Sequence, residues 1–271
     1  MGEKYFGKEQ AEELCPFLTA EILDECGSTS TLLKERAAEG EGEFYALFAK
    51  KQTAGRGRLN RSFLSPSGGL YFSLILRPKM PPESSTLITA AAAVAATEAI
   101  EAVSGKAAEI KWVNDIFIGD KKVCGILCEG KIDPQNSLLE YAVLGVGINV
   151  FEPENGFGPE INDIAAALFK GEENEQIYLK LAARFLNTFK GYYDDLLSKK
   201  YMDKYIEKSY LTGREVCYTK NGILHEGRVV GIDRDANLII DENGIRQKLF
   251  SGEVSVKVRG NGRLRRIDIN S

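Results

Sequence analysis

A short segment between residues 52 and 63, QTAGRGRLNRSF, combines cations and glycines in a way that suits anion binding. Gly55 and Gly57 allow backbone conformations that bring amide N–H groups close to a ligand, and Arg56 and Arg58 supply forked charged donors. Such a combination binds phosphate or carboxylate groups. The alternative is an exposed turn with solvated arginines, because charged loops are common. The segment alone leaves both interpretations open.

A second segment, KWVNDIFIGDKKVCGIL at residues 111–127, mixes polar groups into an otherwise apolar stretch. If its first part is a strand, Lys111 and Asp115 share one face. Asp115 can then hold a magnesium ion or orient a lysine, and Lys122, at the start of the next strand, can reach back over the same site. A charged hairpin packed on Trp112 is the alternative, because charged side chains of hairpins are usually solvated.

Alternating strands and helices must position these two segments. The patterns predict the following elements: helices over 9–20, 28–39 and 84–105, strands over 44–55, 68–78, 108–120, 121–131 and 139–151, a loop over 152–159, and helical periodicity from 161 to about 211. Sheet-forming segments that alternate with helices and hairpins indicate an α+β fold, in which helices pack against a mixed sheet.

The character of the chain changes near Leu211. Residues 213–258 read as short strands broken by Asn-Gly and Asp-Ala-Asn turns, the pattern of a small barrel. We therefore expect two domains, residues 1–211 and residues 212–271.

Composition excludes several classes of protein. The 271 residues carry a formal net charge of −4, whereas domains that coat DNA or RNA usually show excess positive charge over a whole face. His225 is the single histidine, so a Ser-His-Asp triad or a multi-histidine zinc site would have to include it. We expect His225 to be a surface residue in a turn.

Cysteine usage and hydropathy indicate a cytoplasmic protein. The five cysteines are odd in number and scattered, and the N-terminal segment MGEKYFGKEQ lacks the apolar stretch of a signal peptide. The longest apolar run, 87–96, is about half the length that a bilayer crossing requires. We therefore expect no membrane span.

The ordered motifs of the chain resemble those of the biotin protein ligases. The motifs are Ser28-Thr29, QTAGRGR at 52–58, SPSGGLYFSL at 65–74, KWVND at 111–115, KKVCGIL at 121–127 and GVGIN at 145–149. The resemblance covers nearly the whole chain, and six motifs in order are far more specific than any one of them. It implies a catalytic domain like that of class II synthetases and a small C-terminal SH3-like barrel, to which GIDRDANLIIDENG and SGEVSV are similar.

The resemblance also implies a reaction. The family uses ATP and Mg²⁺ to join biotin to AMP, releases pyrophosphate, and passes the biotinoyl group to a lysine of a biotin carboxyl carrier protein or domain. Two anions meet in the first step, so cations and amides must offset their repulsion, and the loop must keep water from the mixed anhydride. The family includes monomers and homodimers, and no stretch of this sequence distinguishes them.

The resemblance assigns roles residue by residue. Arg58, Lys122 and Asp115 are implied to be catalytic, with Asp115 assisting magnesium or positioning the lysine. The implied biotin-binding residues are Ser28, Thr29, Gln52, Gly55, Arg56, Lys122, Gly125, Leu127, Gly145 and Gly147, of which the first three bind the ureido ring and Gly125, Leu127, Gly145 and Gly147 line a slot for the apolar part. The implied nucleotide-binding residues are Arg58, Lys111, Asn114 and Asn149, the last near the phosphates. For the second step, Asp115 is the nearest candidate general base.

The sequence departs from the family pattern at several positions. Val113 replaces the proline of KWPND, Phe63 replaces a tryptophan after the arginine loop, and RLNR replaces a run richer in arginine and glycine. Only about 20 residues precede the catalytic region, fewer than a three-helix DNA-reading domain needs. We therefore expect a ligase that neither binds DNA specifically nor represses transcription.

Three other functions remain open. A lipoate ligase or octanoyl transferase shares the catalytic fold, although Ser28, Thr29 and Gln52 favour a ureido-bearing ligand. A nucleic-acid-binding module is a second alternative, against which net acidity and the lack of a basic aromatic platform argue. A metal or redox site at Cys124 and Cys128 is a third, but their spacing matches no common metal motif.

Overall fold

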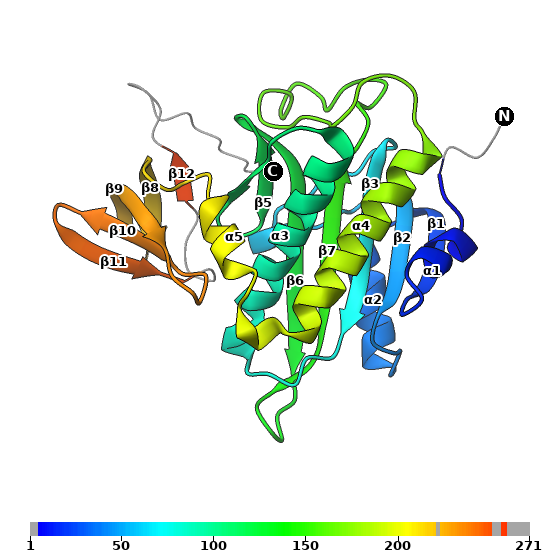
Figure 1. Cartoon of the computed structure of the whole chain (residues 1–271), viewed down its shortest axis with the longest axis horizontal. Helices are drawn as coiled ribbons and strands as arrows, with labels where there is room; N and C mark the ends of the chain where they lie inside the picture. The colour runs from blue at the N-terminus through cyan, green and yellow to red at the C-terminus, as the bar shows by residue number, and fades with distance from the viewer. Residues whose placement is uncertain (1–4, 221–222, 251–255, 259–271) are drawn as a thin grey trace.

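Two β-sheets organise the part of the chain that the computed structural model describes, residues 5–220, 223–250 and 256–258 (Figure 1). The larger sheet has the strand order β1-β2-β3-β7-β6-β5-β4. Its strands are β1 (Thr19–Cys26), β2 (Tyr45–Gln52), β3 (Gly69–Leu76), β4 (Glu109–Lys111), β5 (Asp115–Ile118), β6 (Lys121–Ile132) and β7 (Leu139–Asn149). Strands β1 and β2 are parallel and every other neighbouring pair is antiparallel, so the sheet is mixed, as predicted.

Helices cover both faces of this sheet. They are α1 (Lys8–Leu14), α2 (Thr29–Ala38), α3 (Ser85–Ser104), α4 (Glu175–Asp194) and α5 (Met202–Glu207), with short 3-10 turns η1 (Arg58–Asn60), η2 (Pro82–Ser84) and η3 (Leu196–Ser198). Figure 1 shows α3 and α4 side by side across one face. Helix α2 packs on the opposite face, where Leu33 and Ala37 join Leu47, Ile75 and Val143 in a separate apolar cluster.

Helix α3 forms the centre of the main core. Its alanine-rich interior favours helix and lets neighbouring elements approach closely, and Gly105 ends it with a left-handed φ of 69°. The stretch Pro82–Ser104 is long and apolar enough to span a membrane, but 72% of its most apolar window is buried inside the protein. It therefore reads as a core helix of this fold.

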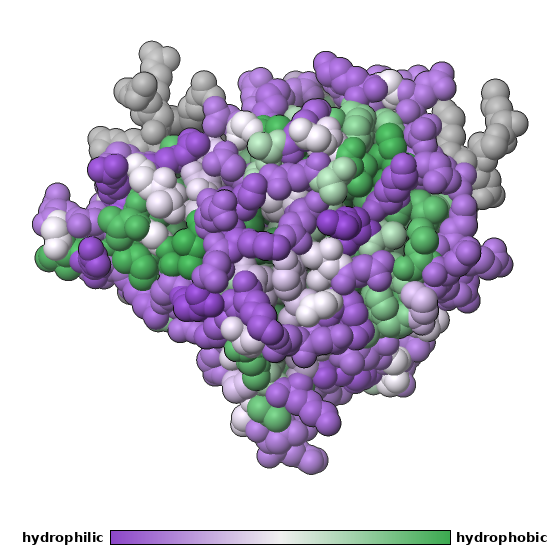
Figure 2. Space-filling view, viewed as in Figure 1, coloured by the Kyte–Doolittle hydropathy of each residue, from purple (hydrophilic) through white to green (hydrophobic). Residues whose placement is uncertain are grey.

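The smaller sheet is antiparallel, with the order β11-β10-β9-β8-β12. Its strands are β8 (Glu215–Lys220), β9 (Ile223–Ile232), β10 (Leu238–Glu242), β11 (Ile245–Leu249) and β12 (Val256–Val258). Asn243 and Gly244 both have positive φ, as a tight hairpin turn requires. The predicted Asn221-Gly222 turn, and all of SGEVSV except its last residue, lie outside the described residues. Figure 2 shows apolar surface over these strands, where Ile223, Leu224, Val230 and Ile245 are exposed.

Several elements differ from the sequence prediction. The helix predicted over 9–20 ends at Leu14, just before Pro16, and an unpredicted edge strand, β1, follows it. The strand predicted over 108–120 is a hairpin of β4 and β5, because Trp112–Asn114 form a turn. Residues 161–174 carry no helix. His225 lies in β9 instead of a turn, stacked on Tyr218.

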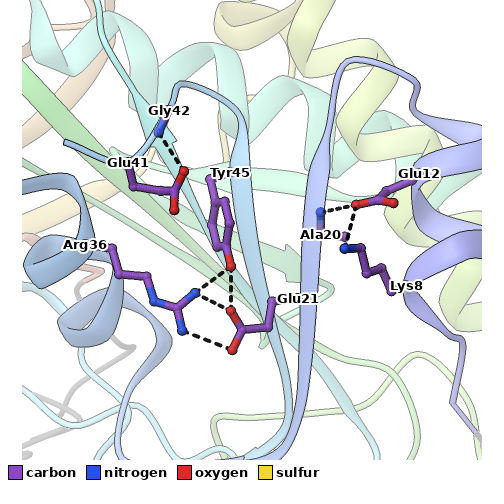
Figure 3. Close-up of polar contacts among 8 residues, drawn as sticks. All are labelled: Lys8, Glu12, Ala20, Glu21, Arg36, Glu41, Gly42 and Tyr45. Atoms are coloured by element: carbon purple, nitrogen blue, oxygen red, sulfur yellow. Dashed lines mark hydrogen bonds and ion pairs between the residues drawn. The ribbon is translucent and has the colours of Figure 1, made fainter. Parts of the chain in front are cut away.

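A polar cluster joins α2 to the first two strands (Figure 3). The guanidinium of Arg36 donates to both carboxylate oxygens of Glu21, and the Tyr45 hydroxyl donates to the same carboxylate at 2.5 Å. On the outer side of β1, Glu12 accepts the backbone N–H of Ala20 at 2.8 Å. These contacts hold an edge strand that carries several charged side chains.

Replacing Arg36 with alanine is expected to lower the free energy of unfolding by about 2 kcal/mol, because the half-buried Glu21 carboxylate loses its charged donors. Hydrogen bonds from Arg36 hold the pKa of Glu21 below its usual value. This stabilisation is therefore present above the ordinary glutamate pKa and is lost as the pH falls through the lowered value. Urea unfolding of the variant and wild type should show a difference that shrinks below about pH 4.

Lys50→Ala is the matched control. Lys50 pairs with Asp24, whose side chain is 89% exposed, so this ion pair contributes little in water. The control should unfold within about 0.5 kcal/mol of wild type. If Arg36→Ala were equally mild, or if its effect were the same at pH 3 and pH 7, the Arg36–Glu21–Tyr45 cluster would have no structural importance.

Candidate active site

Three central strands of the large sheet present an almost bare backbone surface toward α2 and the arginine loop. Gly125 of β6 lies opposite Gly147 of β7, and Leu127 lies opposite Gly145. On the other side of β7, Ser73 of β3 lies opposite Gly145. Since side chains alternate across a strand, these residues share one face. The structure thus brings together the four residues predicted to line an apolar slot.

The ring of Phe63 lies directly on this glycine surface. A Cβ atom built on Gly147 would be 2.6 Å from the ring, and one built on Gly125 would be 2.8 Å from it. Tyr71 meets the same ring edge-on at 6.4 Å between centroids. An apolar ligand on the glycines would therefore need the space that the Phe63 ring fills. The ring must move aside, and it can then line the ligand pocket.

Buried hydroxyl and amide groups close one end of the glycine surface. The Thr29 hydroxyl is 2.8 Å from the Ser73 hydroxyl, which is 2.9 Å from that of Ser30. Gln52 accepts the backbone N–H of Thr29 at 2.8 Å and donates to the Ser65 hydroxyl at 2.9 Å. We call Thr29, Ser30, Gln52, Ser65 and Ser73 the polar pocket cluster.

Ser28 stands slightly apart from this cluster. It is the N-cap of α2 and its hydroxyl accepts the backbone N–H of Thr31 at 3.4 Å. Ser28 is buried, and its capping role fixes the start of the helix that carries Thr29 and Ser30.

Lys122 and Asp115 form an ion pair at the other end of the glycine surface. The ammonium is 2.8 Å from the carboxylate, and both side chains are largely covered, with exposures of 30% and 26%. A β-bulge in the pairing of β5 with β6 lets Lys122 turn toward Gly125, on which a Cβ atom would be 3.1 Å from the ammonium. The ammonium is also 5.4 Å from the centre of the Phe63 ring.

The arginine loop wraps over this end of the site. Arg58 donates to the Asn114 side chain at 3.4 Å, and Asn114 in turn donates to the carbonyl of Ile126. Burial lowers the pKa of the Arg58 guanidinium, and the nearby Asp115 carboxylate opposes that shift. Arg58 also lines a cavity of about 70 Å³ at the start of α3.

The remaining predicted residues lie at the edges of the site. Arg56 pairs with Glu129 at 3.1 Å, so its side chain anchors the loop to β6. Lys111 is the cross-strand neighbour of Asp115, and its ammonium lies 5.1 Å from the centre of the Phe117 ring.

Asn149 is the last residue of β7. It follows Gly147 along the strand and lies at the end of the glycine surface opposite the polar pocket cluster. It donates to the carbonyl of Ala166 at 3.1 Å, whereas its Oδ1 is buried and accepts no hydrogen bond from any of the described residues. The oxygen is an acceptor, so it suits a ligand hydroxyl or amino group better than a phosphate oxygen.

A magnesium ion fits this site only as an ion carried by a nucleotide. Within the described residues no group of three or more His, Cys, Asp or Glu side chains could hold a metal by itself. Magnesium usually takes one or two protein carboxylates together with substrate phosphates. Asp115, a single carboxylate beside Lys122, matches that pattern.

The cysteine alternative has no structural support. Cys124 and Cys128 lie on the same side of β6, and burial raises the pKa of both thiols, that of Cys128 to about 12. Reactive or metal-binding thiols need a lowered pKa. All five cysteines lie within the described residues, and none of them forms a disulfide bond.

Sequence reasoning missed the serines of the polar pocket cluster. Ser30, Ser65 and Ser73 received no role, yet each is buried. Ser73 carried the clearest signal, because a serine interrupts GGLYFSLIL, which is otherwise almost purely apolar. A buried hydroxyl in a strand requires a partner, and that partner is supplied here by Thr29 and Ser30.

Comparison with known proteins identifies the family. Residues 25–149 match the family described as "Biotin/lipoate A/B protein ligase family", and residues 212–257 match "Biotin protein ligase C terminal domain". The bifunctional ligase/repressor BirA of Bacillus subtilis is 33% identical over 238 residues, which cover 86% of this chain and 72% of that protein. The chain belongs to the biotin protein ligase family.

Further relatives agree with this ligase assignment. The biotin–[acetyl-CoA-carboxylase] ligase of Paracoccus denitrificans is 25% identical and covers 77% of this chain and 88% of its own. The biotin protein ligase of Aquifex aeolicus in complex with biotin and ATP superposes with a TM-score of 0.73 at 29% identity, covering 89% of the ligase described here and 99% of the Aquifex chain. The predicted family and fold class, including the small C-terminal domain, are confirmed.

Proposed function

We propose that this ligase activates biotin with ATP and transfers it to a carrier lysine. The biotin carboxylate attacks the α-phosphorus of ATP, forming biotinoyl-AMP and releasing pyrophosphate. The ε-amine of a lysine on a biotin carboxyl carrier domain then attacks the biotinoyl carbonyl, forming an amide and releasing AMP and a proton.

The observation that carries the proposal is the polar pocket cluster at one end of the glycine surface. The ureido ring of biotin has two N–H donors and a carbonyl, which need partners once buried. Thr29, Gln52 and Ser73 provide hydroxyl and amide groups that both donate and accept. These groups bond to one another in the structure, and a purely aliphatic acyl chain would use none of their remaining hydrogen-bonding capacity, so octanoate suits this end less well than a ureido ring.

The other end of the surface supports charge neutralisation. Lys122 and Arg58 are covered cations within reach of the position where the biotin carboxylate and the α-phosphate must meet. In such a sheltered site, fixed cations stabilise developing negative charge far more than they do in water. Asp115 holds the Lys122 ammonium and, with the nucleotide bound, would face its magnesium ion, which neutralises phosphate charge.

We further propose that the nucleotide extends toward Asn149. Its buried Oδ1 would accept a hydrogen bond from a ribose hydroxyl or the adenine amino group, while Lys111 and Asn114 flank the phosphates. This modifies the sequence prediction, which placed Asn149 near the phosphates.

For the transfer step, Asp115 remains the carboxylate nearest to the reacting atoms. Its carboxylate is already engaged by the Lys122 ammonium at 2.8 Å. Proton loss from the carrier lysine to solvent is therefore consistent with this site.

The adenylation step can be tested by biotin-dependent exchange of labelled pyrophosphate into ATP. We expect exchange with biotin and magnesium, and none with lipoate or octanoate. Exchange with lipoate in place of biotin would overturn the substrate assignment, and no exchange with any acid would overturn the adenylate route.

Two further expectations belong to this proposal. We propose a reducing compartment such as the cytoplasm as the working location, which is supported by five cysteines, all within the described residues, that form no disulfide bond. The expectation that the ligase does not repress transcription stays a prediction. An electrophoretic mobility shift with a biotin operon promoter at moderate salt tests it, and tight, specific binding would contradict it.

A further inference from the structure

Trp112 connects the active-site hairpin, formed by β4 and β5, to the domain of the smaller sheet, β8 to β12, which is called the C-terminal barrel below after the family fold. Its indole is 7% exposed, and its Nε1–H donates to the backbone carbonyl of Ala236 at 2.7 Å, 124 positions away in the sequence. A buried donor or acceptor that loses its partner is destabilising, because nothing replaces its hydrogen bond to water. This hydrogen bond therefore fixes the turn of the hairpin against the barrel.

The barrel segment that receives Trp112 is a tightly organised turn. The carboxylate of Asp233 accepts the backbone N–H groups of Asp235 and Asn237, both at 2.9 Å. Ala236, fully buried between them, has a φ of 60°, and its carbonyl accepts the Trp112 indole N–H. The acceptor for Trp112 is thus held rigidly.

A second contact reaches the next residue of the hairpin. The buried Tyr205 hydroxyl, on α5, donates to the carbonyl of Val113 at 2.9 Å. Helix α5 is itself bound to the barrel turn, because Asp203 pairs with Arg234 at 2.6 Å. Barrel turn, α5 and hairpin therefore form one connected unit.

The two residues that follow these contacts belong to the proposed active site. Asn114 donates a hydrogen bond to the carbonyl of Ile126 and accepts one from Arg58. Asp115 forms an ion pair with Lys122. Their backbone leaves directly from the anchored Trp112 and Val113. A shift of the anchor would move both side chains relative to Lys122.

We propose that Trp112 is a positioning residue through which the C-terminal barrel sets the nucleotide side of the active site. The inference rests on the proposed function and adds a route by which the barrel acts on catalysis without touching the reacting atoms. Asn114 and Asp115 lie at the end of the site proposed to hold the phosphates. Loss of the Trp112 hydrogen bond should therefore weaken ATP binding and leave the polar pocket cluster, proposed to bind the ureido ring, unaffected.

Trp112→Phe tests this directly, because it keeps an aromatic ring and removes the N–H donor. We expect the KM for ATP in pyrophosphate exchange to rise about 10-fold, which corresponds to roughly 1.4 kcal/mol of lost binding free energy. The KM for biotin should change less than about twofold. Tyr205→Phe should give the same split. Tyr193→Phe is the matched control, since that hydroxyl, on α4, donates to Glu43 away from the hairpin and α5, and it should behave as wild type.

Amide hydrogen exchange provides a readout that does not depend on activity. In folded Trp112→Phe protein, exchange of residues 109–118 should be about 10-fold faster, with α4 unchanged. Equal rises in both KM values, or wild-type kinetics in both variants, would overturn the positioning role. If the wild-type protein does not exchange pyrophosphate into ATP, the proposed function is wrong. Unchanged amide hydrogen exchange in Trp112→Phe would separately refute the anchoring role of Trp112.

Discussion

Replacing Lys122 with methionine is expected to lower kcat/KM for biotin-dependent pyrophosphate exchange by roughly 100-fold to 1,000-fold, the usual cost of removing one preorganised charge-stabilising donor. Methionine keeps an unbranched side chain of similar length, so packing beside the Phe63 ring changes little. The loss should appear mainly in kcat, because the ammonium is needed most while the carboxylate and phosphate combine.

Lys121→Met is the control for this variant. Lys121 precedes Lys122 in the same strand, but its exposed ammonium donates to the carbonyl of Asn162 away from the glycine surface. It should retain wild-type kcat/KM within about twofold, as surface substitutions generally do. Equal losses in the two variants would show that Lys122 has no particular role in the chemistry.

Gly55→Ala is expected to reduce biotin activation by about 100-fold, because a misplacement of about 1 Å in a positioning loop has this effect. A Cβ atom on Gly55 would lie 2.3 Å from the backbone oxygen of Phe63 and 2.6 Å from the Ser65 hydroxyl. The Gly55 carbonyl also accepts the Phe63 N–H at 2.9 Å, which closes the loop. The added methyl group must open that closure and displace both Phe63 and the polar pocket cluster.

The stability of Gly55→Ala should change by only about 1–3 kcal/mol, typical of local overpacking, so the protein stays folded. Gly42→Ala is the matched control: a Cβ atom there meets nothing within 4 Å, and Gly42 has no positive φ. Initial-rate measurements at varied biotin, together with thermal unfolding, separate the two effects. An active Gly55→Ala enzyme would show that the closed loop is not the working conformation.

The elements with strong local patterns could be predicted from the sequence. Helix α3 shows the expected signals: serine and threonine hydroxyls at its start, an alanine-rich interior and Gly105 at its end. Strands β3 and β7 are largely apolar runs bounded by turn residues. Strand β1 was missed because it is an edge strand: Glu21, Asp24 and Glu25 give it the polarity of a surface segment, which edge strands commonly have.

Tertiary contacts explain what local patterns could not show. The turn at 112–114 looks like continuous strand in the sequence, and its anchors come from Ala236 and Tyr205, about 90 or more positions away. The predicted residues Lys122, Asp115 and Gly125 do meet. Phe63, however, lies on the glycines through the closure of the arginine loop, which no periodicity reveals.

The most direct test of the central claim is covalent labelling of a biotin carboxyl carrier domain. The protein is mixed with biotin, MgATP and the carrier, and the carrier is probed with streptavidin. We predict a labelled band that requires ATP and disappears when the carrier's target lysine is replaced with arginine, whereas Lys122→Met gives almost none. Absence of label with wild-type protein under conditions in which lipoate or octanoate becomes attached to its own carrier domain would contradict the account.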